Sequence, residues 1–292
     1  MKYIKLIRVK HYLKNLLVFL PLFFNASIFD MDLFIRTGTG FISFCFISSV
    51  VYIINDIKDV EYDRLHISKR TRPIANNSIP IKKAILLVII LGLMSITLSI
   101  TASNSNYYLV LFPLVYLAVF FAYSIKWKHI PILDITILAS GFLMRLMYGS
   151  AISGIAISGW LYLTVIVVSF YMGIGKRFNE LKINEDLAES ERIRHVLTFY
   201  TINFLDKSKY MFLCLAIVFY SLWTIDPITI ERTNSEYLFW SVPLVIIICL
   251  LYNLNIETHD DGDPIEVLYK NKPLMILTLL FITMIFGLIY II

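Results

Sequence analysis

The sequence predicts an all-α integral membrane protein, a bundle of nine transmembrane helices, from three observations. Of its 292 residues, 58% are hydrophobic and 16% are charged, whereas soluble domains contain about 45–50% apolar and about 25% charged residues. The apolar residues form runs of about 20, the length that a helix needs to cross a bilayer. The loops between the runs differ in charge on alternate sides. Because no long polar insert interrupts the runs, we expect one domain over residues 1–292.

Nine runs are apolar enough to be considered as spans, although the first is short and contains Pro21. They cover residues 14–30, 38–57, 83–102, 107–125, 131–151, 158–176, 209–225, 236–254 and 273–292. The second and fifth runs carry polar residues at an end or inside. We expect these two spans to face a functional site rather than lipid.

The positions of the lysines and arginines predict the orientation. With nine spans, Arg36 and Arg232 fall on one side and Arg145 falls within a span, while every other Lys and Arg falls on the opposite side. Basic loops stay in the cytoplasm. We therefore expect a cytoplasmic N-terminus in the inner (plasma) membrane, with Ile292 outside. The basic loops are also the longer and more polar ones, so the active site is expected at the cytoplasmic face.

Cysteine placement and net charge exclude several function classes. Cys45, Cys214 and Cys249 lie inside apolar runs and form no CxxC pair, so neither a disulfide framework nor a zinc site is expected. The net charge of +5 follows the membrane topology, so no nucleic-acid partner is expected.

The strongest chemical signal is an acidic motif at the cytoplasmic end of the second run. Asn55, Asp56, Asp59 and Asp63 are spaced three or four residues apart, and on a helix such residues share one face. Three carboxylates on one face repel each other unless a cation lies between them. Mg²⁺ takes oxygen ligands and shares its coordination with phosphates. The motif therefore predicts a Mg²⁺ and diphosphate site, with a solvated helix end as the alternative.

Basic residues follow this motif. Lys69, Arg70 and Arg72 are suited to neutralising a polyphosphate, although membrane topology and anionic lipid would also account for some of them. Arg145 lies inside an apolar run that begins near Asp134. Along one straight helix the two would be about 16 Å apart, too far for contact. We therefore expect Arg145 to face a polar cavity.

Several weaker signals lie at other cytoplasmic ends of spans, where interfacial Lys and Tyr are common anchors. They are Lys14, Asn15, Tyr123, Lys126, Lys128, Lys176, Arg177 and Glu180. Together they predict a ring of cations around the acidic motif.

The motif Asn55-Asp56-x-x-Asp59-x-x-x-Asp63 resembles the first aspartate motif of the UbiA-type prenyltransferase superfamily. Within it, the chain is most similar to the decaprenyl-phosphate phosphoribosyltransferases. The other matching segments are Arg8-x-Lys10-x-x-x-Lys14-Asn15, Arg64-x-His66-x-x-Lys69-Arg70-x-Arg72-Pro73-Ile74-Ala75, Tyr123-Ser124, Asp134, Gly141-Phe142-x-x-Arg145, Ser158-x-Trp160, Gly175-Lys176-Arg177-x-x-Glu180-Leu181, Phe204-Leu205-Asp206 and Gly262-Asp263-Pro264.

One departure from the superfamily pattern concerns the donor substrate. The resemblance implies a second Asp-rich motif after the sixth span, where ordinary members hold a second Mg²⁺. Here Lys176, Arg177 and Glu180 stand in that place. One Mg²⁺ with a basic pocket suits a phosphoribosyl diphosphate donor better than the two-metal ionisation of an allylic diphosphate.

The resemblance thus implies a Mg²⁺-dependent glycosyltransferase (a pentosyltransferase) of cell-wall biogenesis. It would move a 5-phosphoribosyl group from phosphoribosyl diphosphate to a decaprenyl-type polyprenyl phosphate. The expected metal ligands are Asn55, Asp56, Asp59 and Asp63, and the expected catalytic residues are Asp56, Asp59, Asp63, Arg145 and Lys176. The expected substrate contacts are Lys14, Asn15, Lys69, Arg70, Arg72, Tyr123, Lys128, Asp134, Arg145, Lys176, Arg177 and Glu180.

Two other interpretations stay open at this point. One is a UbiA-type prenyl diphosphate:aromatic acceptor prenyltransferase, and the other is a lipid transporter or scaffold without enzymatic activity. A CDP-alcohol phosphotransferase is disfavoured because its DG…AR…G…D…D pattern is absent. The resemblance also suggests a homo-oligomer and leaves the length of the lipid open.

Overall fold

The computed structural model describes residues 2–65, 69–103, 107–185, 195–258 and 264–291. Within these ranges every regular element is a helix, and no strand occurs. The predicted all-α class is confirmed. Three residues of the matching segments, His66, Gly262 and Asp263, lie outside the described residues. By its contacts the chain divides into two compact units.

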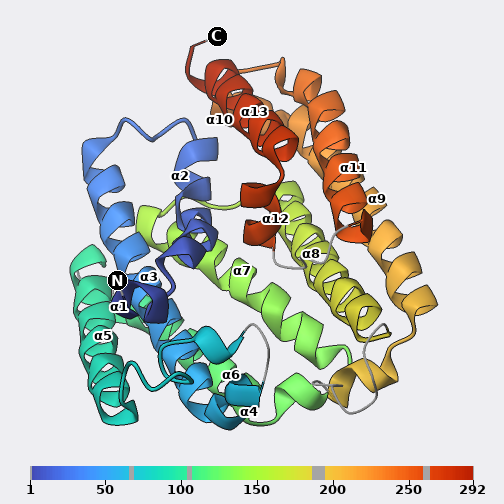
Figure 1. Cartoon of the computed structure of the whole chain (residues 1–292). Coiled ribbons are helices and arrows are strands. Elements are labelled where there is room, and N and C mark those ends of the chain that lie inside the picture. Colours follow the sequence, from blue (N-terminus) through green and yellow to red (C-terminus); the bar gives the residue numbers. More distant parts are fainter. Residues whose placement is uncertain (1, 66–68, 104–106, 186–194, 259–263, 292) are drawn as a thin grey trace. The chain divides into compact units, whose positions relative to one another are not determined.

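The first unit contains Met1–Leu22, Ile28–Trp127 and Met144–Ala156. Its elements are α1 (Lys2–Leu6), the 3₁₀ helix η1 (Val9–Phe19), the start of α2 (Leu20–Phe24), α3 (Met31–Lys58), α4 (Val60–Leu65), η2 (Lys69–Thr71), α5 (Ile81–Ala102), η3 (Tyr107–Val110), α6 (Leu111–Ile125) and the second half of α7 (Leu133–Ser153). Helix α3 packs against α5, α6 and η1, and α3 and α5 lie side by side in Figure 1. The core of this unit is therefore built around α3.

Helix α3 carries the acidic motif at its end. Its N-terminus is capped by Asp30, whose side chain accepts hydrogen bonds from the amides of Asp32 and Leu33, satisfying two of the orphan donors of the first turn. The helix ends at Lys58, and α4 begins one residue after Asp59. Its 28 residues give a length of about 42 Å. The helix is therefore long enough to cross a bilayer and to continue beyond it.

The backbone of the acidic motif keeps helical hydrogen bonding across the break. The amide of Asp59 donates to the carbonyl of Asn55 at 2.9 Å, and the amide of Asp63 donates to the carbonyl of Asp59 at 2.8 Å. Asp59 itself has φ −92° and ψ 13°, which lies in the sparsely populated bridge region. The predicted i,i+4 spacing therefore holds, but the motif is divided between α3 and α4.

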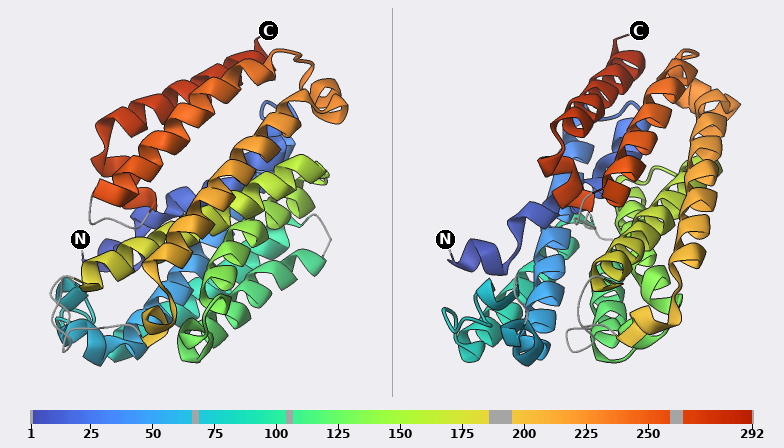
Figure 2. Two further views of the ribbon diagram at one scale, coloured as in Figure 1. Left: turned by 90° about the vertical axis from the view of Figure 1, so that its right-hand side faces the viewer. Right: turned by 45° about the vertical axis from the view of Figure 1, so that its right-hand side comes forward.

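The second unit contains Phe23–Ser27, Lys128–Leu143 and Ile157–Ile292. Its elements are η4 (Trp127–His129), the first half of α7, α8 (Gly159–Glu185), η6 (His195–Phe199), α9 (Ile202–Ile225), α10 (Pro227–Thr233), η7 (Leu238–Ser241), α11 (Val242–Thr258), α12 (Pro264–Lys270) and α13 (Lys272–Tyr290). Helices α8 and α9 pack along each other, as both views of Figure 2 show. A cluster of buried aromatic and aliphatic side chains, including Tyr171, Phe178, Leu213 and Ile256, joins them to α11.

Eight helices among the described residues are long and apolar enough to span a membrane. They are Met31–Lys58, Ile81–Ala102, Tyr107–Ile125, Leu133–Ser153, Gly159–Ile183, Ile202–Ile225, Leu238–Thr258 and Lys272–Tyr290. Each overlaps one of the predicted runs, so the chain is a multi-pass membrane protein.

The first predicted run, 14–30, does not form one α-helix. It is divided between the 3₁₀ helix η1 and the five-residue α2, and a turn with Ala26 at φ 52° follows. Pro21 explains part of this outcome, because proline lacks an amide hydrogen and its ring collides with the carbonyl four residues earlier in an α-helix. The total of nine spans therefore stays a prediction.

Gly149 allows α7 to lie directly against the backbone of η1. A Cβ atom built on Gly149 would overlap the carbonyl group of Val18, whereas a Cβ on Gly92 in α5 would meet nothing within 4 Å. Small residues serve such close approaches between membrane helices. Within the first unit, these two glycines are thus a matched pair that differs in packing.

We expect Gly149→Ala to destabilise the protein by about 1–3 kcal/mol, because the added methyl group forces two backbones apart. Gly92→Ala should be neutral or stabilising by up to about 1 kcal/mol, because alanine favours a helix interior over glycine. Thermal unfolding of the purified variants in one detergent measures both. Equal melting temperatures for the two variants would contradict the close packing at Gly149.

Candidate active site

Two buried carboxylates of the acidic motif share one arginine. Asp56 is 2% exposed and Asp63 is 4% exposed. Arg72 Nη1 lies 2.7 Å from Asp63 Oδ2 and 3.1 Å from Asp56 Oδ1. Arg8 Nη2 lies 2.5 Å from the same oxygen of Asp56. The cation that the spacing of the acids requires is therefore supplied here by guanidinium groups.

The loop that follows the motif positions Arg72. The backbone amide of Arg72 donates to the carbonyl of Lys69 at 2.9 Å, and the amide of Ile79 donates to the carbonyl of Pro73 at 3.0 Å. Arg64 Nε donates to the carbonyl of Ala75 at 3.2 Å. These bonds fold the loop back toward α4, so that Arg72 reaches the acidic motif. Of the other predicted basic residues here, Lys69 is half-buried and Arg70 is exposed.

The beginning of the acidic motif is tied to the end of α6. Ser124 Oγ donates to Asn55 Oδ1 at 3.2 Å, and Lys58 Nζ donates to the carbonyl of Ser124 at 2.6 Å. Tyr123, a predicted substrate contact, is the preceding residue and is buried. Sequence reasoning gave Ser124 no role of its own, although the Tyr123-Ser124 pair was part of the family resemblance.

The acidic motif fits a metal that is shared with a ligand. Among the residues that the structure describes, no three His, Cys, Asp or Glu side chains are grouped to hold a metal ion. Two carboxylates, those of Asp56 and Asp63, do converge on one point, where Arg72 Nη1 already places a positive charge. Mg²⁺ usually takes one or two carboxylates and completes its shell with water and phosphate oxygens. Asn55 and Asp59 stay predicted ligands.

Arg145 and Asn15, both predicted substrate contacts, meet inside the first unit. Arg145 Nε donates to Asn15 Oδ1 at 2.7 Å, and Arg145 Nη2 donates to Tyr116 Oη at 3.0 Å and to Ser48 Oγ at 3.3 Å. Its guanidinium also lies over the ring of Phe44, 5.1 Å from the centroid. The polar cavity expected beside Arg145 stays a prediction. The partners that the structure shows are side chains of α3, α6 and η1, so Arg145 joins these helices.

A second ionic cluster lies in the second unit. Arg177 is fully buried and lies 2.6 Å from Asp134 and 2.5 Å from Glu180. Tyr200 donates a 2.6 Å hydrogen bond to the other oxygen of Asp134 and accepts one from the amide of Ile132. Asp134 therefore contacts Arg177, in keeping with its expected distance from Arg145 along α7. Burial and the hydrogen bond to Asp134 raise the pKa of Tyr200, so its hydroxyl stays protonated and can donate.

Three predicted lysines, Lys14, Lys128 and Lys176, are half-buried, in η1, η4 and α8 respectively. Lys176 adjoins Arg177 in sequence, so successive residues on α8 combine a fully enclosed cation with a partly accessible one. We expect this difference to separate their roles, because Arg177 is enclosed with Asp134 and Glu180, whereas part of the Lys176 side chain is accessible.

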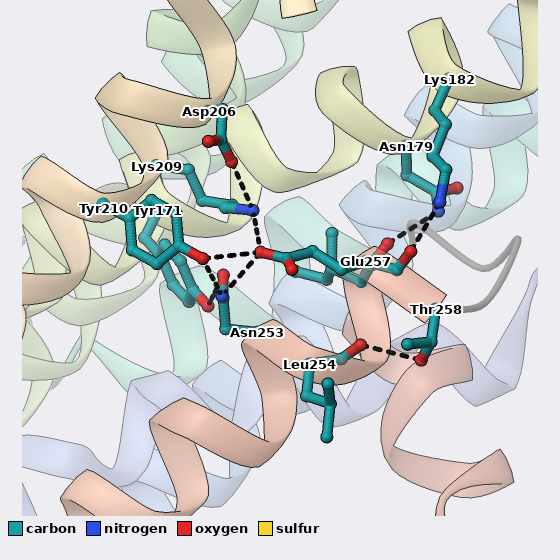
Figure 3. A network of polar contacts seen from close by, with 11 residues as sticks. Tyr171, Asn179, Lys182, Asp206, Lys209, Tyr210, Asn253, Leu254, Glu257 and Thr258 are labelled. Carbon is teal, nitrogen blue, oxygen red and sulfur yellow. Dashed lines mark hydrogen bonds and ion pairs between the residues drawn. The ribbon is translucent and has the colours of Figure 1, made fainter. Parts of the chain in front are cut away.

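Sequence reasoning missed a polar network around Lys209, which Figure 3 shows. Lys209 is fully buried, and its Nζ lies 2.8 Å from Glu257 and 3.0 Å from Asp206. Asn253 and Tyr210 donate further hydrogen bonds to Glu257. The i,i+3 spacing of Asp206 and Lys209 was a readable signal, but nothing in the sequence indicated that Glu257 would join them. The network connects α9 to α11 within the second unit.

We expect Arg177→Met to lower the stability by about 3–5 kcal/mol, because it leaves the buried carboxylate of Asp134 without its cation. Glu180→Gln should lower the stability far less, because Glu180 is partly exposed and the ion pair between Arg177 and Asp134 remains. Thermal unfolding in detergent compares the two variants. Adding Asp134→Asn to Arg177→Met should recover part of the loss; no recovery would show that charge compensation is not the cause.

Comparison with known proteins is consistent with this architecture. The model of the UbiA prenyltransferase family matches residues 16–280. The chain is 35% identical to the decaprenyl-phosphate phosphoribosyltransferase of Corynebacterium glutamicum, over 99% of this chain and 86% of that protein. It is 34% identical to the protein of the same name from Mycolicibacterium smegmatis, over 98% of this chain and 92% of that protein. A solved UbiA homologue of Archaeoglobus fulgidus, bound to DMAPP and Mg²⁺, has a TM-score of 0.72 at 21% identity and full coverage of both chains. That likeness shows the fold.

Proposed function

Because the chain belongs to the UbiA prenyltransferase family, a family of membrane transferases, we propose that it transfers a 5-phosphoribosyl group from phosphoribosyl diphosphate to a polyprenyl phosphate. Diphosphate is released, and the reaction depends on Mg²⁺. Two relatives that match over nearly the whole chain carry the name decaprenyl-phosphate phosphoribosyltransferase. Their names support both the donor and the acceptor class.

The enclosure of Arg177 is the observation that carries the proposal. It occupies the place where a second acidic motif would bind a second metal for a prenyl diphosphate. Its guanidinium takes two protein carboxylates, Asp134 and Glu180, so these acids are already compensated by a side chain. This arrangement favours a donor that needs one metal over the alternative of a prenyl diphosphate donor.

The donor would bind at the acidic motif of the first unit. Asp56 and Asp63, with Asn55 and Asp59, would hold Mg²⁺ together with the diphosphate oxygens. When bound, the metal acts as a Lewis acid that neutralises the leaving diphosphate.

Basic side chains beside the motif would take the charge that remains on the donor. Lys69, Arg70 and Arg72 would contact the diphosphate or the 5-phosphate, since a guanidinium offers two parallel donors to such an anion. Of the three, Arg72 is already held at the motif by its ion pairs.

The acceptor phosphate would be positioned by a second set of basic residues. Lys176 is partly accessible and would contact it, whereas Arg177 would act as a positioning residue that holds Asp134 and Glu180. Arg145, an expected catalytic residue, would act here as a positioning residue that holds Asn15; its direct contact with the acceptor phosphate stays a prediction. Lys14, Tyr123 and Lys128 stay proposed contacts of the same phosphate or its ribosyl product.

The proposed transfer does not require a strong general base. The acceptor phosphate is already an anion near neutral pH, and one of its oxygens forms the new bond to the anomeric carbon as the bond to diphosphate breaks. The ribosyl carbon passes through an oxocarbenium-like state. Positioning and electrostatic stabilisation can supply such catalysis, which agrees with an active site made of carboxylates, guanidiniums and ammonium groups.

The distribution of basic loops supports a location for the reaction. We propose that the chain acts as one domain in the inner membrane, with the acidic motif and Lys176 at the cytoplasmic face. The water-soluble donor, phosphoribosyl diphosphate, would reach them from that side. The lipid tail of the acceptor stays in the bilayer. A homo-oligomer is part of the same proposal.

Transfer itself is the decisive test. Purified protein in detergent, Mg²⁺ and labelled phosphoribosyl diphosphate should convert a polyprenyl monophosphate into a labelled lipid and release diphosphate. EDTA should abolish the label. Activity on a prenyl diphosphate with an aromatic acceptor, and none with the phosphoribosyl donor, would overturn the proposal in favour of the prenyltransferase alternative. Binding of lipid without any turnover would favour the transporter or scaffold.

We expect Asp63→Asn to lower turnover by about 100-fold or more, because electrostatic terms of this kind are worth several kcal/mol in an active site. Asp32→Asn is the matched control, since Asp32 lies at the other end of α3 and is exposed; it should keep full activity. Initial rates at several Mg²⁺ concentrations measure the effect. A fully active and well-folded Asp63→Asn variant would remove this carboxylate from the proposed site.

A further inference from the structure

Arg8 contacts the acidic motif but has no role in the proposed function. Its side chain lies 2.5 Å from Asp56 and stacks over the ring of Tyr52, 4.7 Å from the centroid. Arg8 has φ 54° and ψ 50°, a left-handed conformation that is unfavourable for a residue with a side chain. The neighbouring backbone is fixed to α3, since Ser49 Oγ donates to the carbonyl of Ile7 at 2.9 Å. The N-terminal segment is thus anchored in a way that presents Arg8 to Asp56.

Two guanidiniums therefore compensate two buried carboxylates. Arg8 and Arg72 contact the same oxygen of Asp56, and Arg72 also contacts Asp63. Burying a carboxylate without a partner is costly, so these cations stabilise the site in the absence of metal. Arg72 Nη1 occupies the point on which both carboxylates converge. A metal ion and this guanidinium group cannot use the same oxygens at the same point.

We infer that Arg8 and Arg72 are built-in counterions that compete with a divalent cation for Asp56 and Asp63. A metal that binds alone must displace guanidiniums that then have no anion nearby. When the donor binds with the metal, its phosphate oxygens offer the displaced guanidiniums a new bidentate partner. Metal and phosphate ligand should therefore bind cooperatively, and each should raise the affinity for the other by the same factor. The identity of the phosphate ligand rests on the proposed function, whereas the competition for the carboxylates does not.

Competition for the carboxylates predicts that losing Arg8 changes the affinities for metal and for donor in opposite directions. A merely structural role does not predict this. Removing the positive charge of Arg8 should raise the affinity for a metal alone, because the carboxylate of Asp56 loses a competitor. It should weaken the binding of the phosphate donor, because one of its cations is gone. A residue that only supports the fold would lower both affinities or leave both unchanged.

The test titrates Mn²⁺ alone into the full-length protein in detergent and follows the free ion by electron paramagnetic resonance. We expect Arg8→Gln to bind Mn²⁺ about tenfold more tightly than the unsubstituted protein, or more. The effect of one charge about 4 Å away ranges from roughly fivefold in bulk water to roughly a thousandfold at the effective dielectric of a protein surface. Lys5→Gln is the matched control, because it removes one charge from an exposed residue of the same segment. It should change the affinity by less than about twofold. Arg8→Lys, which keeps the charge, should stay near the unsubstituted value.

The donor side is measured by KM for phosphoribosyl diphosphate at saturating Mg²⁺, which should rise about tenfold in Arg8→Gln. Unchanged or weaker Mn²⁺ binding by a folded Arg8→Gln variant would overturn the inference. If that variant does not fold, Arg72→Gln carries the same expectation, since Arg72 contacts the same carboxylates. Tighter Mn²⁺ binding together with no phosphoribosyl transfer would refute the proposed function and leave the competition standing.

Discussion

The need to compensate buried charge is the constraint on which both units of this protein depend. In the first unit, Asp56 and Asp63 are almost inaccessible and are matched by Arg8 and Arg72. In the second unit, Asp134 is matched by Arg177. The Arg8–Asp56 and Arg177–Asp134 pairs join residues 48 and 43 positions apart in sequence. The same interactions that make these charges tolerable therefore also fix the loops and helix ends that carry the proposed chemistry.

The two units use compensation differently. In the second unit, one fully buried cation has two carboxylate partners, Asp134 and Glu180, and Lys209 repeats this arrangement with Asp206 and Glu257. In the first unit, two half-buried arginines share a pair of carboxylates that could also bind a metal. An arginine can exchange one anionic partner for another more easily where its long side chain is partly exposed to solvent, as those of Arg8 and Arg72 are. Ligand-dependent rearrangement is thus expected at Asp56 and Asp63, while Arg177 and Lys209 stay structural.

Much of the fold was predictable because membrane spans are encoded locally, in runs of about 20 apolar residues. Eight predicted runs correspond to observed helices. The run at 14–30 is divided between η1 and α2. Pro21, which is visible in the sequence, explains only part of this division. The acidic motif was predictable from its i,i+4 spacing. Its pairing with Arg8 was not, because 48 residues separate Arg8 from Asp56 and only the folded N-terminal segment brings them together.

A charge reversal at one position also changes what a site needs in order to be stable. Two acids placed where Arg177 and Glu180 stand would repel each other and would require a metal ion between them. With Arg177 in that place, Asp134 and Glu180 receive their cation from the protein itself, and this cluster is complete without any ligand. A place for an external cation is then proposed only at Asp56 and Asp63, where it would exchange with Arg8 and Arg72. The ion pairs of Arg177 can therefore stay unchanged during the proposed reaction, while those of Asp56 and Asp63 change when the donor binds.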